Sequence, residues 1–366
     1  MSNEESLIKK AHKLKKEGKF DEAAKFYSLI VEKSPCLDWT YVNLGEVLAS
    51  QGNIDKAVAN LHKAVDINPD SAWNYYKLGQ ALVKQKKEEE AIAYLQRAIS
   101  IKPEQYRPHK VLGQIFLQNG RLQEALNELE KASKINPSSC QNDSKILREL
   151  SFKLKHGDSI NYWENRYKKG GNSGAGSFND LAKYKAGVLN DLVAGKNIKT
   201  IIDFGCGDGN QLQLAKYPNY IGLDVSKTAI MKCYQAFKND STKSFYLYDP
   251  LSFFNENKFF TADLTISVDV LYHLIEDEIY FKYLNDLFGC AKKIVVIYSW
   301  NFSEGEDKFA LHIRPRHFTK DIDKHIKGWR LKEKLDNPYP VEKYGTKDGS
   351  YSDFYIYCQA DSLTNS

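Results

Sequence analysis

The stretch "IIDFGCGDGNQL", residues 201–212, decides how the second half of the chain folds. A β-branched apolar run reaches Asp203, and glycines follow at positions 205, 207 and 209. An apolar run before a glycine-rich turn is typical of a buried strand that leads into a ligand-binding loop. The turn by itself leaves three ligands open: a dinucleotide, a nucleoside triphosphate and a cofactor without phosphates.

The segments around this turn alternate between strand and helix patterns. Strand patterns cover 198–204, 220–226, 243–250, 262–274 and 292–300, and helical spacing covers 210–217, 227–237 and 277–291. Such alternation predicts parallel strands with crossover helices, a doubly wound, Rossmann-like α/β domain. Two last strand patterns, 329–335 and 352–359, are expected to pair antiparallel at one edge. Ligands of such sheets bind beyond the carboxyl ends of the strands, where Asp224, Asp249 and Asp269 also fall.

Two of the three ligands fit the turn poorly. The sequence lacks the GxxxxGK motif of a nucleoside-triphosphate loop, and Asn210 replaces the third glycine of the dinucleotide fingerprint. The carboxylate of Asp208 would repel a pyrophosphate. S-adenosylmethionine carries no phosphate: the glycines can approach its amino-acid and ribose side, Asp224 can accept both ribose hydroxyls, and Asp249 can accept the adenine amino group.

Four motifs in this order, "DFGCGDG", "GLDVS", "LYDP" and "ISVDVLYHL", resemble those of class I S-adenosylmethionine-dependent methyltransferases over about residues 160–360. The resemblance implies a set of cofactor-binding residues: Asp203, Gly205, Cys206, Gly207, Asp224, Asp249 and Ser267. It also implies that the Ser267–Asp269 segment lies beside the methyl group. Tyr272 departs from the pattern, because related sequences often have Glu before the His.

A looser likeness concerns the methyl acceptor. The stretches "YWENRYKKGGNSGAGS" (162–177), "LDNPYP" and "SDFYIY" are similar to methyltransferases that occur beside glycosyltransferases in surface-polysaccharide assembly. This likeness implies a sugar or glycan acceptor. A sugar hydroxyl benefits from a general base, and we expect His273, together with Asp269, to act there. The alternative is that His273 caps the following helix or packs against Tyr272.

Two further segments are expected to contact ligands. In "HIRPRHF" (312–318) the substrate-binding candidates are His312, Arg314, Arg316 and His317. Paired arginines can clamp a carboxylate or phosphate, and either histidine is an alternative base. A solvated basic loop, or ion pairs with the acidic run "SEGEDKF" (303–309), would explain the cluster equally. Arg166 is expected to bind the methionine carboxylate, with loop 170–177 as a lid, unless that loop is only a linker. A metal site at Asp249, Asp269 and His273 is possible in composition, but we expect none.

The first half of the chain repeats itself. Prolines stand at 35, 69, 103 and 137, each 34 residues apart, after the related phrases "YSLIVEKSP", "LHKAVDINP", "LQRAISIKP" and "LEKASKINP". Small residues recur upstream, as at Gly45, Gly79 and Gly113. The array resembles the tetratricopeptide repeat, an α solenoid with a period of 34. Lys86 stands in the third copy where a turn glycine is usual. We expect a protein partner in the repeat groove, with self-association as the alternative.

Composition bounds the remaining possibilities. The chain has 366 residues, 42% of them hydrophobic, and a formal net charge of +5, which is modest for a nucleic-acid binder. The six cysteines are widely spaced, and no apolar run is long enough to span a membrane. The sequence predicts a cytoplasmic protein with repeats at 1–140, a capping helix and linker at 141–158, and a methyltransferase domain at 159–366. A protein methyltransferase whose repeats capture the substrate, or a non-catalytic scaffold, remains the alternative.

Overall fold

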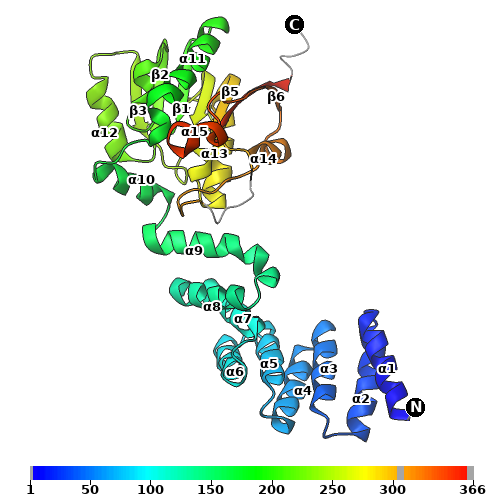
Figure 1. Ribbon diagram of the computed structural model, residues 1–366. Coiled ribbons are helices and arrows are strands. Elements are labelled where there is room, and N and C mark those ends of the chain that lie inside the picture. The colour runs from blue at the N-terminus through cyan, green and yellow to red at the C-terminus, as the bar shows by residue number, and fades with distance from the viewer. Residues whose placement is uncertain (1–2, 303–308, 361–366) are drawn as a thin grey trace. The chain divides into compact units, whose positions relative to one another are not determined.

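The computed structural model describes residues 3–302 and 309–360 (Figure 1). The chain divides into two compact units, Met1–Ser151 and Phe152–Ser366. The division falls within helix α9 (Ser144–His156), inside the segment 141–158 that the sequence assigns to a capping helix and linker. A short 3₁₀ helix, η1 (Ser138–Asp143), leads into α9.

The first unit is built of helix pairs, as the repeat pattern predicts. In the described residues the pairs are α1 (Asn3–Lys16) with α2 (Phe20–Lys33), α3 (Asp38–Ser50) with α4 (Ile54–Ile67), α5 (Ala72–Lys84) with α6 (Glu88–Ile101), and α7 (Tyr106–Gln118) with α8 (Leu122–Ile135). The second helix of each pair ends two residues before its proline. The residue that precedes the proline has a ψ between 70° and 87°, because the proline ring excludes the helical conformation there.

Glycine allows the two helices of a pair to approach closely. A Cβ atom at Gly45 would lie 2.7 Å from the Leu61 side chain, and one at Gly113 would lie 2.6 Å from Leu129. The turn between paired helices needs a left-handed residue: Gly52 has φ +83° and Gly120 has φ +70°. Lys86 occupies the same position in the third copy and adopts φ +62°, a conformation that costs a residue with a side chain about 1–2 kcal/mol.

The second unit is a seven-stranded sheet in the order β3-β2-β1-β4-β5-β7-β6. Its strands are β1 (Thr200–Phe204), β2 (Asn219–Asp224), β3 (Lys243–Leu247), β4 (Ala262–Val268), β5 (Ala291–Ser299), β6 (Trp329–Leu335) and β7 (Asp353–Gln359). The first five are parallel, β7 is antiparallel to β5, and β6 is antiparallel to β7. The strand patterns therefore predict both the parallel sheet and its antiparallel edge.

Helices cover both faces of this sheet because its strands alternate between two cores. Ile202 and Phe204 pack with α13 (Asp277–Gly289) and α14 (Phe318–His325), whereas Ile201 packs with α11 (Asn179–Gly195) and α12 (Lys227–Ala236). Helix α10 (Ser159–Lys168) precedes the sheet, and α15 (Val341–Asp348) lies between β6 and β7. Short 3₁₀ turns complete the unit: η2 (Ala175–Ser177), η3 (Gln211–Leu214) and η4 (Leu271–His273).

One predicted helix is wrong. The segment 210–217 forms only the single turn η3. The side chain of Gln211 donates to the carbonyl of Ala182, and Pro218 excludes its preceding residue from the helical conformation, so the turn stops early. Within residues 3–302 and 309–360, none of the helices combines the length and apolar character that crossing a bilayer requires.

Candidate active site

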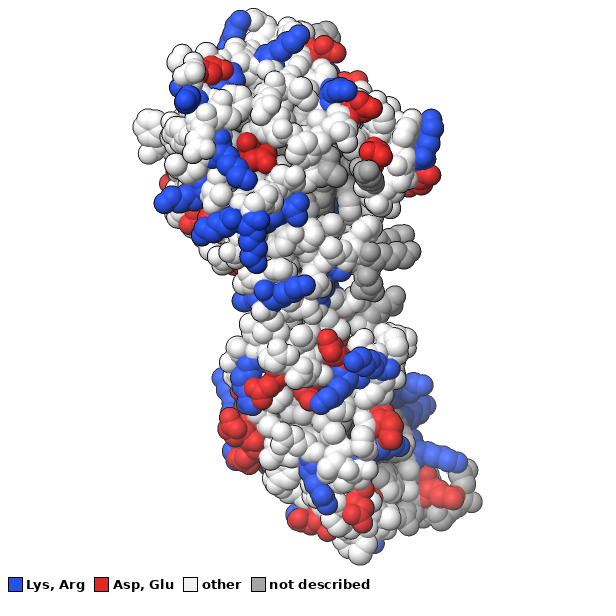
Figure 2. Space-filling view, turned by 60° about the vertical axis from the view of Figure 1, so that its left-hand side comes forward, with Lys and Arg blue, Asp and Glu red and all other residues white. Residues whose placement is uncertain are grey.

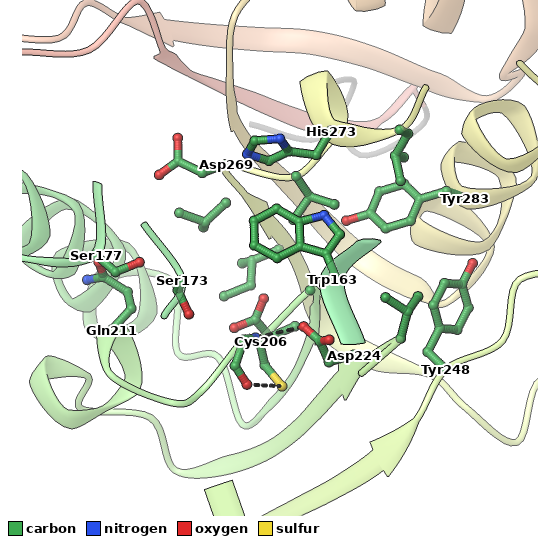
Figure 3. A pocket seen from close by; sticks show the side chains of 18 of the residues that line it. Trp163, Ser173, Ser177, Cys206, Gln211, Asp224, Tyr248, Asp269, His273 and Tyr283 are labelled. Carbon is green, nitrogen blue, oxygen red and sulfur yellow. Dashed lines mark hydrogen bonds between the residues drawn. The ribbon is translucent and has the colours of Figure 1, made fainter. Parts of the chain in front are cut away.

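A pocket opens in the second unit beyond the carboxyl ends of the parallel strands (Figure 3). It encloses about 1110 Å³, part of which is open to solvent. Residues at the ends of β1, β2 and β4 line it, together with residues of α10, α11 and α13. Seven of the predicted site residues line this pocket: Asp203, Gly205, Cys206, Gly207, Asp224, Asp269 and His273.

The glycine turn can be built only without side chains. Gly205 and Gly207 have φ +87° and φ +60°, in the left-handed region that favours glycine. A Cβ atom at Gly205 would lie 2.4 Å from Val270, and one at Gly207 would lie 2.3 Å from the hydroxyl of Ser173. Between them, Cys206 is buried, and the neighbouring Cys233 thiol together with burial raises the pKa of Cys206 well above its usual range. The thiol therefore stays protonated.

Two carboxylates at the strand ends are held in unusual protonation equilibria. Burial raises the pKa of Asp224 to about 6, although the backbone N–H groups of Ser226 and Gly207 donate to its two oxygens. Burial raises the pKa of Asp203 to about 7, against a hydrogen bond of 2.8 Å from the Tyr220 hydroxyl to Oδ2. A cationic ligand would stabilise the charged form of both groups.

Two buried acceptor atoms of pocket residues lack a hydrogen-bond partner in the part of the chain that the structure describes. They are Oδ1 of Asp203 and Oε1 of Gln211. A buried acceptor without a partner costs about 1–3 kcal/mol. A ligand that donates hydrogen bonds would recover this cost.

The loop before α11 closes over the glycine turn, as the lid prediction requires. The hydroxyl of Ser173 donates to Asp208 Oδ1 at 2.8 Å, and the Asp208 N–H donates back to the same hydroxyl. The amide side chain of Asn210 donates to the carbonyl of Ser177. Asp208, which the sequence presents as a group hostile to phosphates, thus fastens the loop to the turn.

Helix α10 is fixed to the sheet by Glu164. Its carboxylate accepts hydrogen bonds from the Ser226 hydroxyl at 2.6 Å and from the backbone and side chain of Thr228. Burial alone would raise the pKa of Glu164, but these hydrogen bonds outweigh it and lower the pKa to about 2. The contact lies at the first turn of α12 and holds the Trp163 ring in the pocket.

Asp269 lies in a buried network at the end of β4. Its backbone has φ +60°, and its Oδ2 is 2.7 Å from Nζ of Lys185, a side chain that is 1% exposed. The hydroxyls of Tyr272 and Ser352 donate to Oδ1 at 2.9 and 3.3 Å. Asp269 is therefore an anion held by one cation and two hydroxyls at the pocket wall.

His273 has a defined tautomer. Its Nδ1 lies 3.0 Å from the carbonyl of His312, and because a carbonyl only accepts, Nδ1 carries the proton. Nε2 is then the basic nitrogen. Burial lowers the pKa of His273 to about 4, although Asp269 and the His312 carbonyl favour the charged ring. Figure 3 shows the ring above Trp163, with centroids 4.8 Å apart, on the side of the pocket where Asp269 lies.

Three predicted cofactor residues lie elsewhere among the described residues. Asp249 is exposed after β3 and caps its own turn, accepting from the Leu251 N–H and the Ser252 hydroxyl. Ser267 is fully buried and bonds the Tyr283 hydroxyl at 2.7 Å, since alternation along β4 turns it away from the pocket. Arg166 donates through Nε to the Asn172 carbonyl. None of the three lines the pocket.

The predicted arginine clamp is wrong. Arg314 and Arg316 are 4% and 9% exposed, and both pair with Asp277, at 3.2 and 2.6 Å. Arg316 also donates to the carbonyls of Leu274 and Ile275. These arginines hold the segment after η4 in place and do not face the pocket. Most of the acidic run weighed as their partner, residues 303–308, lies outside the described residues.

The two histidines of that cluster also lie outside the pocket lining among the described residues. The ring of His312 stacks on Tyr162 with centroids 4.7 Å apart, and its carbonyl orients His273. His317 precedes α14 as its cap residue. Neither is placed to act as the alternative base.

Sequence reasoning missed several pocket residues: Trp163, Lys185, Gln211, Tyr248 and Tyr283. Only Lys185 left a trace, as a lysine on the apolar face of a predicted helical stretch. In the described residues, no group of three or more His, Cys, Asp or Glu side chains is arranged to hold a metal ion.

Comparisons with known proteins bear on the two units differently. Tetratricopeptide-repeat family models match residues 36–104 and 82–142. Residues 36–142 are tetratricopeptide repeats. This confirms the repeat prediction and indicates a protein- or peptide-binding unit. Among curated proteins, none matches the chain.

Similar solved structures exist for both units, all at low overall similarity. MamA from Desulfovibrio magneticus RS-1 is 18% identical, with 42% of this chain and 88% of that chain covered and a TM-score of 0.38. YrrB, described as a tetratricopeptide-repeat protein with an unusual peptide-binding site, is 23% identical over 41% and 76% of the two chains, with a TM-score of 0.35. The methyltransferase domain of bacterial CtHen1 is 18% identical over 49% and 99%, with a TM-score of 0.40.

Proposed function

We propose that the second unit is an S-adenosylmethionine-dependent methyltransferase that methylates an oxygen of a sugar or glycan. The observation that carries the proposal is the composition of the pocket. A glycine turn without room for side chains meets two buried carboxylates and two acceptor atoms without partners, at the carboxyl ends of parallel strands. This arrangement suits a ligand that is rich in donors, positively charged and free of phosphate.

The residues present fit such a cofactor. Oδ1 of Asp203 and Oε1 of Gln211 would accept hydrogen bonds from its ammonium group, which satisfies both atoms at once. Asp224, at the end of β2, would accept from the ribose hydroxyls. The bound cofactor supplies an activated methyl group, so the enzyme needs only to align the acceptor and exclude water.

The acceptor would lie between the cofactor and His273. Nε2 of His273 is unprotonated and would take the proton of the attacking hydroxyl. The pKa of about 4 keeps the ring neutral at neutral pH but makes it a weak base, and the anionic Asp269 nearby offsets this by favouring the charged ring. The aromatic face of Trp163 offers a surface against which a sugar ring can stack.

The test is transfer of label. The full chain is incubated with methyl-labelled S-adenosylmethionine and with extracts of its own cell envelope and cytosol, which are then separated into glycan, protein and small-molecule fractions. The proposal expects label in glycan that resists base and protease. Label in none of the fractions, with the cofactor bound, would leave the unit as a non-catalytic scaffold and refute the proposed activity.

A second candidate function is favoured by the repeats. The solenoid at residues 36–142 suits capture of a protein, and the unit may serve a methyltransferase whose acceptor is that protein only if label enters the protein fraction. In that case the glycan acceptor is excluded while the cofactor assignment stands.

A further inference from the structure

We propose that the second unit dimerises through the open edge of its sheet at β3. The proposal goes beyond the methyltransferase reading and does not depend on it. It starts from the exposed apolar side chains of the whole described chain. The large ones that are more than half exposed all lie between residues 231 and 259: Met231 (51%), Tyr234 (51%), Leu247 (58%), Leu251 (59%), Phe254 (78%) and Phe259 (87%).

These side chains surround one strand. In the described residues β3 (Lys243–Leu247) pairs only with β2, so one side of β3 carries unpaired backbone groups. Met231 and Tyr234 come from α12, on one face of the sheet. Leu251, Phe254 and Phe259 come from the loop after β3, whose neighbouring rings pack into the core of the other face. An unpaired edge flanked by apolar groups is a template for another strand.

The loop is built to present its phenylalanines. The side chain of Asn255 donates to the carbonyl of Phe260 at 2.6 Å and accepts from the N–H of the same residue at 2.9 Å. The rings of Phe253 and Phe260 turn inward and meet with centroids 5.8 Å apart. Phe254 and Phe259, next to them in sequence, point outward. The exposure is therefore fixed by the loop and not the result of a loose segment.

A second copy of the chain is the occupant that fits. Antiparallel pairing of β3 with its symmetry mate places α12 beside α12 on one face and loop beside loop on the other, so both groups of apolar side chains are buried together. The six side chains expose on the order of 700 Å², close to the roughly 800 Å² per partner of a standard interface.

An anionic membrane fits less well. The segment 231–259 holds four lysines and three acidic residues, so it offers almost no net charge to anionic lipid. Figure 2 brings this side of the molecule forward and shows the Lys and Arg side chains of the upper unit gathered in a band, with uncharged surface beside it. A neutral apolar edge favours contact with a like edge.

The test uses the full chain in sedimentation velocity and light scattering between 1 and 100 µM. The wild type is expected to be a dimer, and the double variant Phe254→Asp, Phe259→Asp a monomer with self-association at least tenfold weaker. Both positions are exposed, so circular dichroism should stay unchanged. Leu331→Asp is the matched control: Leu331 is exposed on β6, at the opposite edge, and its variant should still dimerise. Amide exchange in β3 should slow as the concentration rises.

Three results would overturn the proposal. The first is a wild type that stays monomeric at 100 µM. The second is a dimer that the double variant preserves, which would locate self-association in another surface such as the repeats. The third is a monomer that binds vesicles of phosphatidylglycerol and phosphatidylcholine through Phe254 and Phe259, which would assign the surface to lipid.

Discussion

Replacing Asp203 with asparagine should stabilise the protein and weaken the cofactor at the same time. Burial raises the pKa of this carboxyl from its ordinary value of 3.8 to about 7. The folded state therefore holds a proton that the unfolded state has lost, and folding stability falls as pH rises from about 4 to about 7. The full difference corresponds to about 4 kcal/mol, at about 1.4 kcal/mol for each pH step between the two values.

Asparagine carries no charge, so Asp203→Asn removes this loss. The gain in stability over the wild type should grow by about 3 kcal/mol between pH 5 and pH 8, because the pKa of about 7 is crossed in that interval. For a unit of this size the gain shifts the melting temperature by roughly 2–4 °C per kcal/mol. Thermal unfolding of the cofactor-free chain, followed by circular dichroism at both pH values, measures it.

The matched control is Asp263→Asn, which should have the opposite sign. Asp263 pairs with Lys293 at 2.8 Å and accepts the Lys199 N–H, and although burial alone would raise the pKa of its carboxyl, these contacts outweigh it and lower the pKa. Its loss should destabilise the chain. The reasoning is refuted if Asp203→Asn gives the same melting temperature as the wild type at pH 8, or gives an equal gain at pH 5. Calorimetry should also show at least tenfold weaker binding of S-adenosylmethionine.

Other substitutions test separate parts of the account. His273→Ala should keep cofactor affinity within about twofold and lower turnover at least tenfold; wild-type turnover would remove its role as base. Lys86→Gly should stabilise the repeats by about 1 kcal/mol by relieving φ +62°, while Gly52→Ala, at φ +83°, should destabilise them by a similar amount in urea unfolding. Glu164→Gln should cost about 2 kcal/mol at pH 7. Because the folded pKa of Glu164 is about 2, that difference should be complete above about pH 4.5 and shrink as pH falls toward 2; a difference independent of pH would contradict the hydrogen-bond network.

The sheet could be predicted because its information is local. Five apolar runs separated by helical spacing give parallel strands, and the 34-residue period gives the helix pairs. The segment 210–217 was mispredicted because a contact with Ala182 and the effect of Pro218 compete with its weak helical pattern. Such contacts are invisible in a local reading of the chain.

The candidate site shows the same limit. The glycine turn and Asp224 were predicted because the end of a parallel strand fixes where a residue lies. Asp249 also follows a strand, but its carboxylate bonds its own turn instead. Arg316 finds its partner Asp277 39 positions away, and Lys185 finds Asp269 at a distance of 84 positions. Nothing in the spacing of the sequence announces either pair.

The most direct test of the central claim is calorimetric titration of the full chain with S-adenosylmethionine, comparing Asp224→Asn with Asp249→Asn. Asp224 lines the pocket, whereas Asp249 caps an exposed turn. The account predicts one site in the wild type, unchanged affinity in Asp249→Asn and at least tenfold weaker affinity in Asp224→Asn. No binding by the wild type, or loss of binding in Asp249→Asn with retention in Asp224→Asn, would contradict it.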